Sequence, residues 1–364
     1  MHFRQLDTPA LFIDLDILEK NLASMTAYCR EHSLALRPHT KTHKTVEVAK
    51  MQLEHGARGL TVAKLGEAEV MAAAGSEDIL IAYPVFGEKK AVRLAKLAQE
   101  NSLLVALDSE RTAEELSRVL AREGSEIGVL VDTDVGAGRC GLPPGAAPVA
   151  LARKIDGLPG LKFRGVMAYF GSVWGTLEER ERILGEIALQ LEKALEAFRK
   201  EKVPVEIVSG GSTPSARLAP RVSGLTEIRP GTYVYNDLNT YHQGACRLED
   251  CAARVVATVV STAVTGQIIV DAGSKTLSSE ALRSGPKSGC GLVMEAPKAE
   301  FHKMNEEHGY VGLPDGGPSF RVGDTVTVIP NHVCPCVNMH DEVFLVRKEE
   351  VVGSWQVAAR GKVR

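Results

Sequence analysis

The sequence predicts an α/β fold, in which a (β/α)₈ TIM barrel is followed by a second, smaller and mostly antiparallel β domain. Three observations favour this fold. Eight short apolar runs recur through the first two thirds of the chain, amphipathic segments separate them, and after about residue 245 the pattern becomes β-rich. Eight strands, each followed by a crossover, indicate a closed barrel, and an open doubly wound sheet is the alternative.

The predicted barrel strands are short runs rich in Leu, Ile and Val. In chain order they cover residues 34–36, 59–63, 79–83, 103–107, 127–131, 163–169, 205–208 and 225–228. The predicted helices repeat apolar residues at helical spacing and carry charges on the opposite face. The clearest of them cover residues 46–55, 67–74, 89–99, 110–122 and 177–201.

The last third of the chain lacks a long amphipathic helix. Its predicted strands are separated by Gly, Pro and Asp turns and cover residues 254–263, 267–271, 325–329, 342–347 and 355–359. The segment before Pro9 is expected to add a strand to them. The predicted domains are therefore residues 10–244 for the barrel and residues 245–364, with 1–9, for the β domain.

Composition limits the kinds of partner. The 364 residues are 44% hydrophobic and 24% charged, and the net charge is −3, so neither nucleic acid nor an anionic membrane is an expected partner. The first residues lack an apolar signal core, and no apolar run is long enough to span a membrane. Seven cysteines without framework spacing indicate reduced thiols. A cytoplasmic protein is expected.

The most informative stretch is residues 37–44, where the first strand ends and the first helix begins. Lys41 in this stretch would lie on the barrel rim, where an amine can react with a carbonyl compound. The neighbouring cations Arg37, His43 and Lys44 favour a neutral amine. A solvated basic turn is the alternative, and it is the more common one for a lone lysine.

A glycine-serine loop follows the seventh predicted strand, where barrels commonly bind phosphate. The candidate phosphate-binding residues are Ser209, Gly210, Gly211, Ser212 and Thr213. The glycines permit close approach of an anion, and the helix that starts near Pro214 adds its positive end. An ordinary turn is the alternative.

Further candidates lie on the same rim. Arg139 is framed by glycines, Tyr169 ends the sixth strand, and Arg229 and Tyr233 follow the eighth. Arg229 is suited to a heterocycle nitrogen or a carboxylate. Singly, each has a structural alternative, such as a local ion pair. A lysine, a phosphate loop, arginines and a phenol on one rim together indicate pyridoxal 5′-phosphate, with Lys41 as its Schiff-base residue.

A second motif covers residues 330–336 in the β-rich part. On an extended segment, residues i and i+2 project to the same side, so His332 and Cys334 are expected to bind one metal ion. Imidazole and thiolate favour Zn²⁺, with Mn²⁺ or Mg²⁺ as alternatives. Cys336 is a candidate third ligand, and His340 is a candidate supporting residue or turn cap. Two strand residues without a metal are the structural alternative.

Together these motifs resemble the D-threonine aldolase/D-serine dehydratase family, which are metal-activated pyridoxal enzymes of the alanine racemase-like fold. The resemblance extends from Leu6 to Gly361 and is carried by residues 37–44, 134–141, 168–172, 209–213, 271–275, 307–309 and 330–335. It implies that Lys41 forms the Schiff base and that His332 and Cys334 bind the metal. It also implies that Arg139 and Tyr169 contact the cofactor ring, with residues 209–213 around its phosphate. A head-to-tail homodimer is implied too, with each β domain closing the partner's barrel mouth.

Two departures from the family pattern matter. Phe170 stands where family members often carry a histidine, so any role of that histidine with the substrate hydroxyl passes to a metal-bound water or to a residue such as His308. The His-x-Cys pair resembles D-serine dehydratases, whereas some D-threonine aldolases have His-x-Asp.

The resemblance implies a pyridoxal phosphate- and divalent-metal-dependent lyase acting on D-β-hydroxy-α-amino acids. Retro-aldol cleavage to glycine and an aldehyde, as in D-threonine aldolase, is the preferred reaction. Dehydration to a 2-oxo acid and ammonia, as in D-serine dehydratase, is the alternative. Less favoured are an amino-acid racemase, which would not need the metal, a non-catalytic pyridoxal phosphate-binding protein, and a barrel enzyme without pyridoxal. Neither the substrate side chain nor the physiological metal follows from the sequence.

Overall fold

The computed structural model describes residues 1–171, 173–283, 285 and 289–364. By their contacts these residues form two compact units. The first unit comprises Met1–Ser24, Thr42–Thr45 and Thr232–Arg360, and the second comprises Met25–Lys41, Val46–Gly231 and Gly361–Arg364. Among the described residues, no helix combines the length and apolar character needed to cross a lipid bilayer.

The second unit contains the predicted barrel. Its described residues form eight parallel strands in the order β2-β9-β8-β7-β6-β5-β4-β3, and a bridge between His39 and Thr61 joins the two ends. The strands are β2 (Ala35–Leu36), β3 (Leu60–Val62), β4 (Asp78–Ile81), β5 (Ser102–Leu107), β6 (Ile127–Thr133), β7 (Leu161–Ala168), β8 (Ile207–Gly210) and β9 (Glu227–Ile228). Each overlaps a predicted strand, because strands buried on both faces read as continuous apolar runs.

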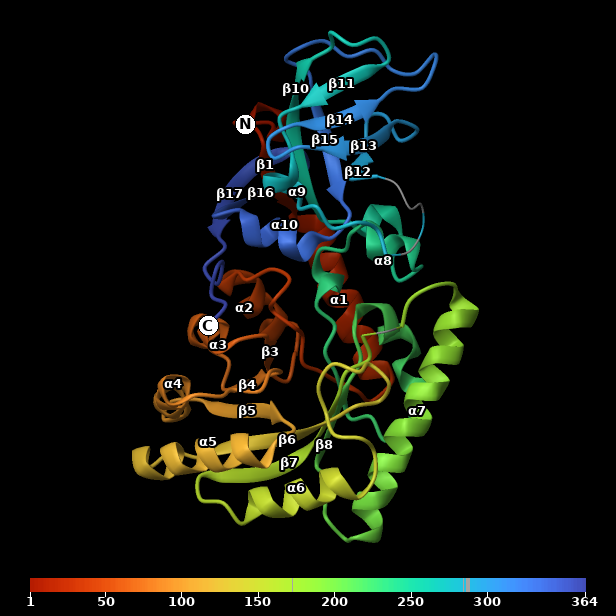
Figure 1. The fold of residues 1–364 in the computed structure, drawn as a ribbon. Helices are drawn as coiled ribbons and strands as arrows, with labels where there is room; N and C mark the ends of the chain where they lie inside the picture. The colour runs from red at the N-terminus through yellow and green to blue at the C-terminus, as the bar shows by residue number, and fades with distance from the viewer. Residues whose placement is uncertain (172, 284, 286–288) are drawn as a thin grey trace. The chain divides into compact units, whose positions relative to one another are not determined.

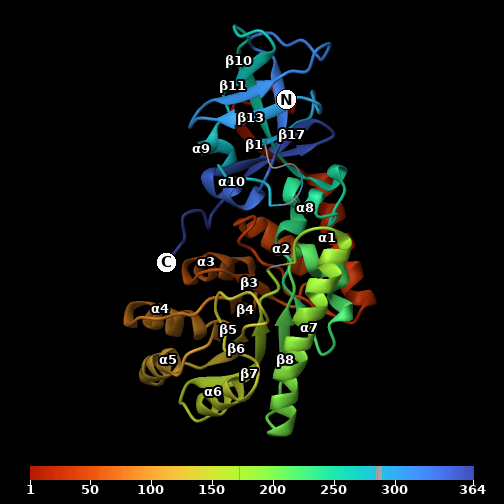
Figure 2. The ribbon, with the colours of Figure 1, turned by 45° about the vertical axis from the view of Figure 1, so that its right-hand side comes forward.

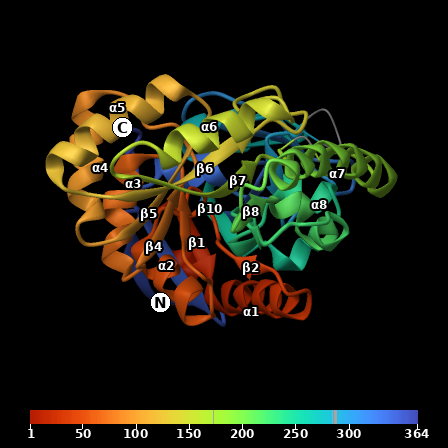
Figure 3. The ribbon, with the colours of Figure 1, turned by 90° about the horizontal axis from the view of Figure 1, so that it is seen from below.

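Helices cover the outside of these strands (Figure 3). They are α2 (Val46–Glu54), α3 (Leu65–Met71), α4 (Glu88–Ala98), α5 (Glu110–Glu123), α6 (Ala146–Asp156), α7 (Leu177–Lys200) and the short 3₁₀-helices η2 (Ala72–Ala74) and η3 (Thr213–Arg221). In α5, Leu116, Val119 and Leu120 recur at helical spacing and are buried. Helix α7, beside β8 in Figure 2, begins at a capping box made by Thr176 and Glu179.

One glycine in β7 is required by strand packing. Gly165 has a φ of +153°, and a Cβ atom there would lie 1.9 Å from the carbonyl oxygen of Ile207 in β8. The β6–β7 register shifts at the same level, between Val129 and Leu130. A bulge of this kind changes the direction of a strand end. The strand end affected here is that of β7, and Tyr169 follows it directly.

The first unit contains the predicted β-rich sheet (Figure 1). Its nine described strands include the path β13-β14-β11-β10-β1-β16-β17, with β15 pairing to β10 and β12. The bounds are β1 (Ala10–Asp14), β10 (Ala253–Ser261), β11 (Gln267–Val270), β12 (Gly291–Val293), β13 (Glu300–Met304), β14 (Gly309–Gly312), β15 (Thr325–Pro330), β16 (Glu342–Arg347) and β17 (Glu350–Gln356). The helical segments are η1 (Phe3–Gln5), α1 (Leu15–Glu31, which continues into the second unit), η4 (Thr232–Val234), α8 (Leu238–His242), η5 (Leu248–Asp250), α9 (Ser274–Leu277) and α10 (Val333–Met339).

The structure differs from the prediction for the β domain in several details. The segment before Pro9 contributes only the isolated bridge of His2 to Glu350 in β17, and Phe3–Gln5 are helical. The full N-terminal strand, β1, follows Pro9 and pairs with β10 on one edge and β16 on the other. The last predicted strand, 355–359, extends only to Gln356, and β12, β13 and β14 were not predicted. Residues 10–24 and 232–244, which the sequence-based boundaries assign to the barrel, make their contacts in the first unit.

Candidate active site

Lys41 lies in the turn between β2 and α2 and is exposed. The chain just before it is fixed by backbone pairing, because the Thr40 amide donates to the Thr61 carbonyl oxygen at 2.8 Å. The Thr40 hydroxyl donates to the same oxygen at 3.2 Å. The lysine therefore follows directly on a segment that is anchored to the next strand of the barrel.

Arg37 is not the free cation expected near Lys41. It is fully buried, and its Nη1 and Nη2 atoms donate to Asp78 at 2.6 and 2.8 Å. Its Nε atom donates to both Glu227 oxygens at 3.0 Å. Burial lowers the pKa of Arg37, but the bonds to Asp78 and the charge of Glu227 outweigh it and raise the pKa. The charge of Arg37 is thus compensated by two carboxylates.

His43 and Lys44, the other two cations of the motif, are buried within the first unit. The Nδ1 atom of His43 accepts a hydrogen bond from the Thr45 amide at 3.1 Å. The Nζ atom of Lys44 donates to the Ala359 carbonyl oxygen at 3.5 Å, and the Lys44 carbonyl accepts from the Ala359 amide at 2.9 Å. Both side chains therefore make their hydrogen bonds within the first unit and do not form a solvated basic patch.

A buried polar row joins β8 and β9. Glu227 accepts hydrogen bonds from Arg37 and from the Ser209 hydroxyl, which in turn accepts one from Nη1 of Arg229. The Nη2 atom of Arg229 donates to the Ala168 carbonyl oxygen at 3.2 Å. Burial lowers the pKa of Arg229 to about 10, so the side chain keeps its charge at neutral pH. The Ser209 hydroxyl, predicted near a phosphate, is instead engaged between Glu227 and Arg229 and positions the arginine.

Replacing Glu227 by glutamine is expected to lower the free energy of unfolding by about 3 kcal/mol, because it leaves the fully buried Arg37 with one carboxylate fewer. Urea unfolding followed by circular dichroism measures the change. Glu206→Gln is the matched control, since Glu206 pairs with Arg164 at 2.7 Å in an exposed position. Its expected effect is below about 1 kcal/mol. Equal effects of the two substitutions would contradict the role of Glu227 as a stabilising partner of the buried Arg37.

Asp132, near the end of β6, was not predicted as a site residue. It is 3% exposed, and its Oδ1 atom has no hydrogen-bond partner in the described part of the chain. Burial raises the pKa of Asp132 to about 6, although the nearby charges of Arg229 and Arg139 act in the opposite direction. Asp108 and Asp134 also face it and add to the rise. A buried carboxylate without a full set of partners is typical of a functional site.

Asp132→Asn is expected to stabilise the cofactor-free protein above pH 6. The folded-state pKa of about 6 lies above the ordinary value of 3.8, so the folded chain holds this proton more tightly than the unfolded chain. That contribution is complete below about pH 4 and is lost as the pH rises through 6. The variant should exceed the native protein by about 2–3 kcal/mol at pH 8 and by little at pH 4. Urea unfolding at both pH values, with the exposed Asp315→Asn as control, tests this; a pH-independent difference would contradict it.

Arg139 and Tyr169 lie together, with the guanidinium 3.7 Å from the centre of the phenol ring. The loop that carries Arg139 is shaped by Asp134. Its Oδ1 atom accepts hydrogen bonds from the amides of Gly136, Ala137 and Gly138 at 3.0, 2.8 and 3.1 Å. Gly136 and Gly138 have φ values of +115° and +62°, which favour glycine.

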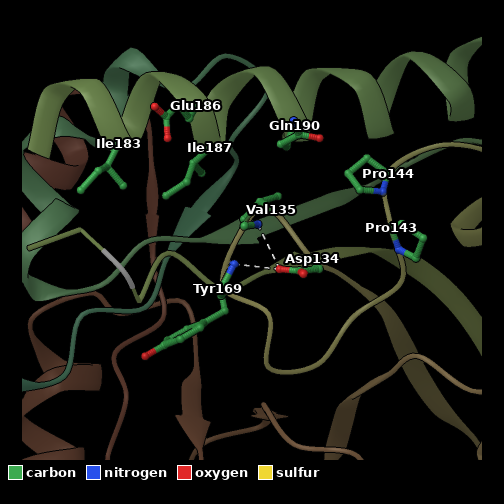
Figure 4. Close-up of a pocket in the computed structure, with 11 residues that line it drawn as sticks. Asp134, Val135, Pro143, Pro144, Tyr169, Ile183, Glu186, Ile187 and Gln190 are labelled. Carbon is green, nitrogen blue, oxygen red and sulfur yellow. Dashed lines mark hydrogen bonds between the residues drawn. The ribbon is translucent and has the colours of Figure 1, made fainter.

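A cavity of about 530 Å³ lies between this loop and α7 (Figure 4). Ile183 and Ile187 of α7 form one wall, and Val135, Pro143 and Pro144 of the loop contribute to the other. In Figure 4 the ring of Tyr169 points away from α7. Tyr169 is the one predicted cofactor-binding residue that lines this cavity, so the cavity is not the predicted cofactor site.

The glycine-serine loop packs tightly against Phe170. A Cβ atom on Gly210 would lie 2.8 Å from both the Phe170 ring and Leu225, and Gly211 has a φ of +75°. The Ser212 amide donates to the Ser215 hydroxyl at 2.9 Å where η3 begins. Phe170, at the position expected for a histidine, is fully buried and serves as packing beneath this loop. Ser172, the last residue of the 168–172 motif that contains Tyr169 and Phe170, lies outside the described residues.

The His332/Cys334 motif is not on an extended segment. His332 is the extended N-cap residue of α10, with φ −136° and ψ 112°, and Cys334 lies in the first turn of that helix. The two side chains still meet, because the Cys334 thiol hydrogen-bonds with the imidazole of His332. The predicted extended segment is therefore wrong, and the two side chains lie at the start of a helix instead.

Two threonine hydroxyls adjoin the Cys334 sulfur. The Sγ atom is 3.3 Å from Oγ1 of Thr42 and 3.9 Å from Oγ1 of Thr232. Thr42 belongs to the first unit, as Cys334 does, and it directly follows Lys41 in the chain. A single peptide bond therefore separates the predicted imine-forming lysine from a residue that contacts the predicted metal ligand.

Cys336 and His340 both contact the main-chain carbonyl oxygen of Thr276. Cys336 is fully buried, its thiol donates to the Thr276 carbonyl oxygen at 3.2 Å, and burial raises its pKa to about 12. The Nε2 atom of His340 lies 3.1 Å from the same oxygen. Both residues attach α10 to α9. In this structure Cys336 is not directed to a site shared with His332, and His340 does not support that site.

The carboxylates next to His332 come from other parts of the chain and were missed in the sequence. Oε2 of Glu280 lies 2.6 Å from Nδ1 of His332, and Oδ2 of the buried Asp237 accepts the Val333 amide at 3.0 Å. Burial lowers the pKa of His332, but Cys334, Asp237 and Glu280 outweigh it and raise the pKa to about 9. Neither carboxylate lies within the motif, so no local pattern pointed to them.

Comparisons with known proteins agree with this architecture. Residues 13–239 match the family model described as "Alanine racemase, N-terminal domain", and residues 252–346 match "Putative serine dehydratase domain". The chain is 35% identical to a D-threonine aldolase of Arthrobacter sp. over 98% of this chain and 93% of that protein. The chain belongs to the D-threonine aldolase/D-serine dehydratase family.

Both activities occur among the names of its relatives. A D-threo-3-hydroxyaspartate dehydratase of Delftia sp. (strain HT23) is 34% identical over 90% of this chain and 91% of that protein. The crystal structure of a D-threonine aldolase from Filomicrobium marinum superimposes with a TM-score of 0.91 and 32% identity, covering 100% of this chain and 98% of that one. The family and its alanine racemase-like fold, expected from the motifs, are thus confirmed.

The side chains fit the two groups that the family resemblance implies. In the described part of the chain, no three His, Cys, Asp or Glu side chains gather to hold a metal ion. The imidazole of His332 and the thiol of Cys334 are ligand types that suit a divalent transition metal. In the barrel, the charged, buried Arg229 and the glycine-serine loop suit an anionic heterocycle such as pyridoxal 5′-phosphate.

Proposed function

We propose that this chain is a pyridoxal phosphate- and divalent-metal-dependent lyase for D-β-hydroxy-α-amino acids, with retro-aldol cleavage of D-threonine-like substrates as its main reaction. The observation that carries the proposal is the contact between Cys334 and Thr42, the residue after Lys41. It links the lysine motif to the metal motif through one short piece of chain. The names of the relatives support the same reaction class.

In the barrel, each candidate residue has a separate task. Lys41 supplies the amine that holds the cofactor, which when bound provides an electron sink for the substrate's α-carbon. Arg229, held by Ser209 and the Ala168 carbonyl, would face the ring nitrogen as a fixed positive charge. Arg139 on Tyr169 would contact the ring from the β6 side. The phosphate would be bound by Gly210, Gly211, Ser212 and Thr213 at the start of η3, and Tyr233 is a further proposed cofactor contact.

In the first unit, His332 and Cys334 would hold the metal, for which Zn²⁺ is the favoured ion. The chemistry supplied there is Lewis-acid polarisation of the substrate's β-hydroxyl group. Phe170 cannot accept the hydroxyl proton, since its side chain is apolar and fully buried. The acceptor in aldol cleavage is therefore water or another polar residue, with His308 as the proposed candidate.

Dehydration is the second candidate function, and the His-x-Cys pair favours it. In that reaction Lys41 would remove the α-proton and the β-hydroxyl would leave. The same ligands serve both reactions, so the alignment of the base decides between them.

A product assay tests the proposal. The purified protein is loaded with pyridoxal phosphate and Zn²⁺ and incubated with D-threonine and with D-serine, with and without a chelator. Glycine and acetaldehyde identify the aldolase. 2-Oxobutyrate or pyruvate with ammonia identifies the dehydratase. Undiminished conversion of either substrate after removal of the metal, or racemisation alone, would contradict the proposal.

We further propose that the protein acts in the cytoplasm as a head-to-tail homodimer. Light scattering coupled to gel filtration would give twice the mass of one chain. A mass of one chain at the concentrations used in the activity assay would contradict the dimer.

A further inference from the structure

Glu280 makes the closest polar contact of the candidate metal ligand His332. It lies between α9 and β12, 52 residues before the histidine, and its Oε2 atom is 2.6 Å from Nδ1 of the ring. The ring is mostly buried, with 20% of its side chain exposed, whereas Glu280 is 44% exposed. Because Nδ1 is engaged by the carboxylate, Nε2 is the ring nitrogen left to bind a metal ion.

The backbone of Glu280 is held by the residue that precedes His332. The Nδ2 atom of Asn331 donates to the Glu280 carbonyl oxygen at 3.1 Å and to the Gly289 carbonyl oxygen at 2.8 Å. Asn331 is buried, so its position is set by the interior of the unit. Asn331 and His332 therefore contact the same glutamate: Asn331 bonds to the main chain of Glu280, and His332 bonds to its side chain.

A second contact fixes the segment beyond Glu280. The Arg283 amide donates to Oδ1 of Asn239 at 2.8 Å, and Asn239 in α8 is itself buried. The Asn239 amide donates to the Asn331 carbonyl oxygen at 3.2 Å. Although the Glu280 side chain is partly exposed, the main chain is thus held by buried asparagines at residue 280 and again at residue 283.

We propose that Glu280 is the positioning residue of the metal site: it accepts the Nδ1 proton of His332 and so leaves Nε2 as the ligand atom. This inference rests on the proposed function, because it assumes that His332 binds a metal. A carboxylate on the far nitrogen of a ligating imidazole fixes the tautomer and the ring orientation. The same proposal assigns a role to Asn331 of the metal motif, which is to hold the main chain of Glu280 in place.

The test measures Zn²⁺ affinity of the full-length, metal-free protein by competition with a chromophoric chelator. Glu280→Ala is expected to raise the dissociation constant about 10- to 100-fold. Glu280→Gln should have a smaller effect, since its amide oxygen can still accept the Nδ1 proton. Glu307→Gln is the matched control, because Glu307 is an exposed carboxylate of the same unit that pairs with Lys275 at 2.9 Å. It should stay within about twofold of the native value.

A second readout separates positioning from a structural role. In the Zn²⁺-loaded protein labelled with ¹⁵N-histidine, the Nδ1 proton of His332 should give a slowly exchanging signal. The signal should be lost in Glu280→Ala and kept in Glu307→Gln. Unchanged affinity and an unchanged signal in Glu280→Ala would overturn the inference, as would equal losses in the control. If Glu280→Ala does not fold, Glu280→Leu, which also lacks an acceptor for the Nδ1 proton, is tested by the same two measurements. Absence of Zn²⁺ binding by the native protein would instead overturn the proposed function.

Discussion

Lys41→Ala is expected to lower the turnover of D-threonine at least about 10³-fold. In the proposed function the amine both holds the cofactor and, in the dehydration route, takes the α-proton, so no neighbouring side chain would replace both tasks. His43 and Lys44, the nearest basic residues along the chain, are buried and bonded to main-chain groups. They are therefore poorly placed to substitute for Lys41.

The measurement combines initial rates with the absorption spectrum of the protein loaded with pyridoxal phosphate. The native protein should show the visible band of a lysine-bound cofactor, and Lys41→Ala should lack it. Lys50→Ala, an exposed lysine on α2, is the matched control and should leave both unchanged. If the band survives in Lys41→Ala, another amine holds the cofactor and the assignment of Lys41 is wrong.

His332→Ala and Cys334→Ala are each expected to reduce bound Zn²⁺ from about one ion per chain to nearly none. Two protein ligands leave little affinity once one is removed. Activity should fall at least about 100-fold in each variant, because the β-hydroxyl loses its Lewis acid. Metal content by elemental analysis and the product assay check these outcomes in parallel.

Controls for the metal variants come from the same unit. His302→Ala removes an exposed imidazole from β13, and Cys290→Ala removes another thiol of the same unit. Both should keep their metal and their activity. A full complement of Zn²⁺ in Cys334→Ala would reject the thiolate as a ligand, whatever its effect on rate.

The barrel was predictable because its information is local. Each strand is buried on both faces and appears as an apolar run, and α5 and α7 show the helical spacing of their buried residues. Lys41, Arg139, Tyr169 and Arg229 could be proposed as candidates for a related reason. In a barrel the carboxyl end of every strand lies on one rim, so knowing where a strand ends locates the residues that follow it.

Helix α10 was not predictable from its own residues. Its seven residues include Pro335 and two cysteines, and its first turn is held by Asp237, whose carboxylate accepts the Val333 amide from 96 residues away. The same limit applies to Ser209. Nothing in the glycine-serine loop indicates that this one hydroxyl is turned inward to Glu227 and Arg229.

Short-range patterns and motifs in the sequence were enough to predict the alternating strands and helices of the barrel, the family, and the residue types available for chemistry. Only the tertiary structure decided which carboxylate serves which cation: Glu227 and Asp78 at Arg37, and Glu280 at His332. The physical reason is that a buried charge needs a partner at hydrogen-bonding distance, and folding draws that partner from any part of the chain.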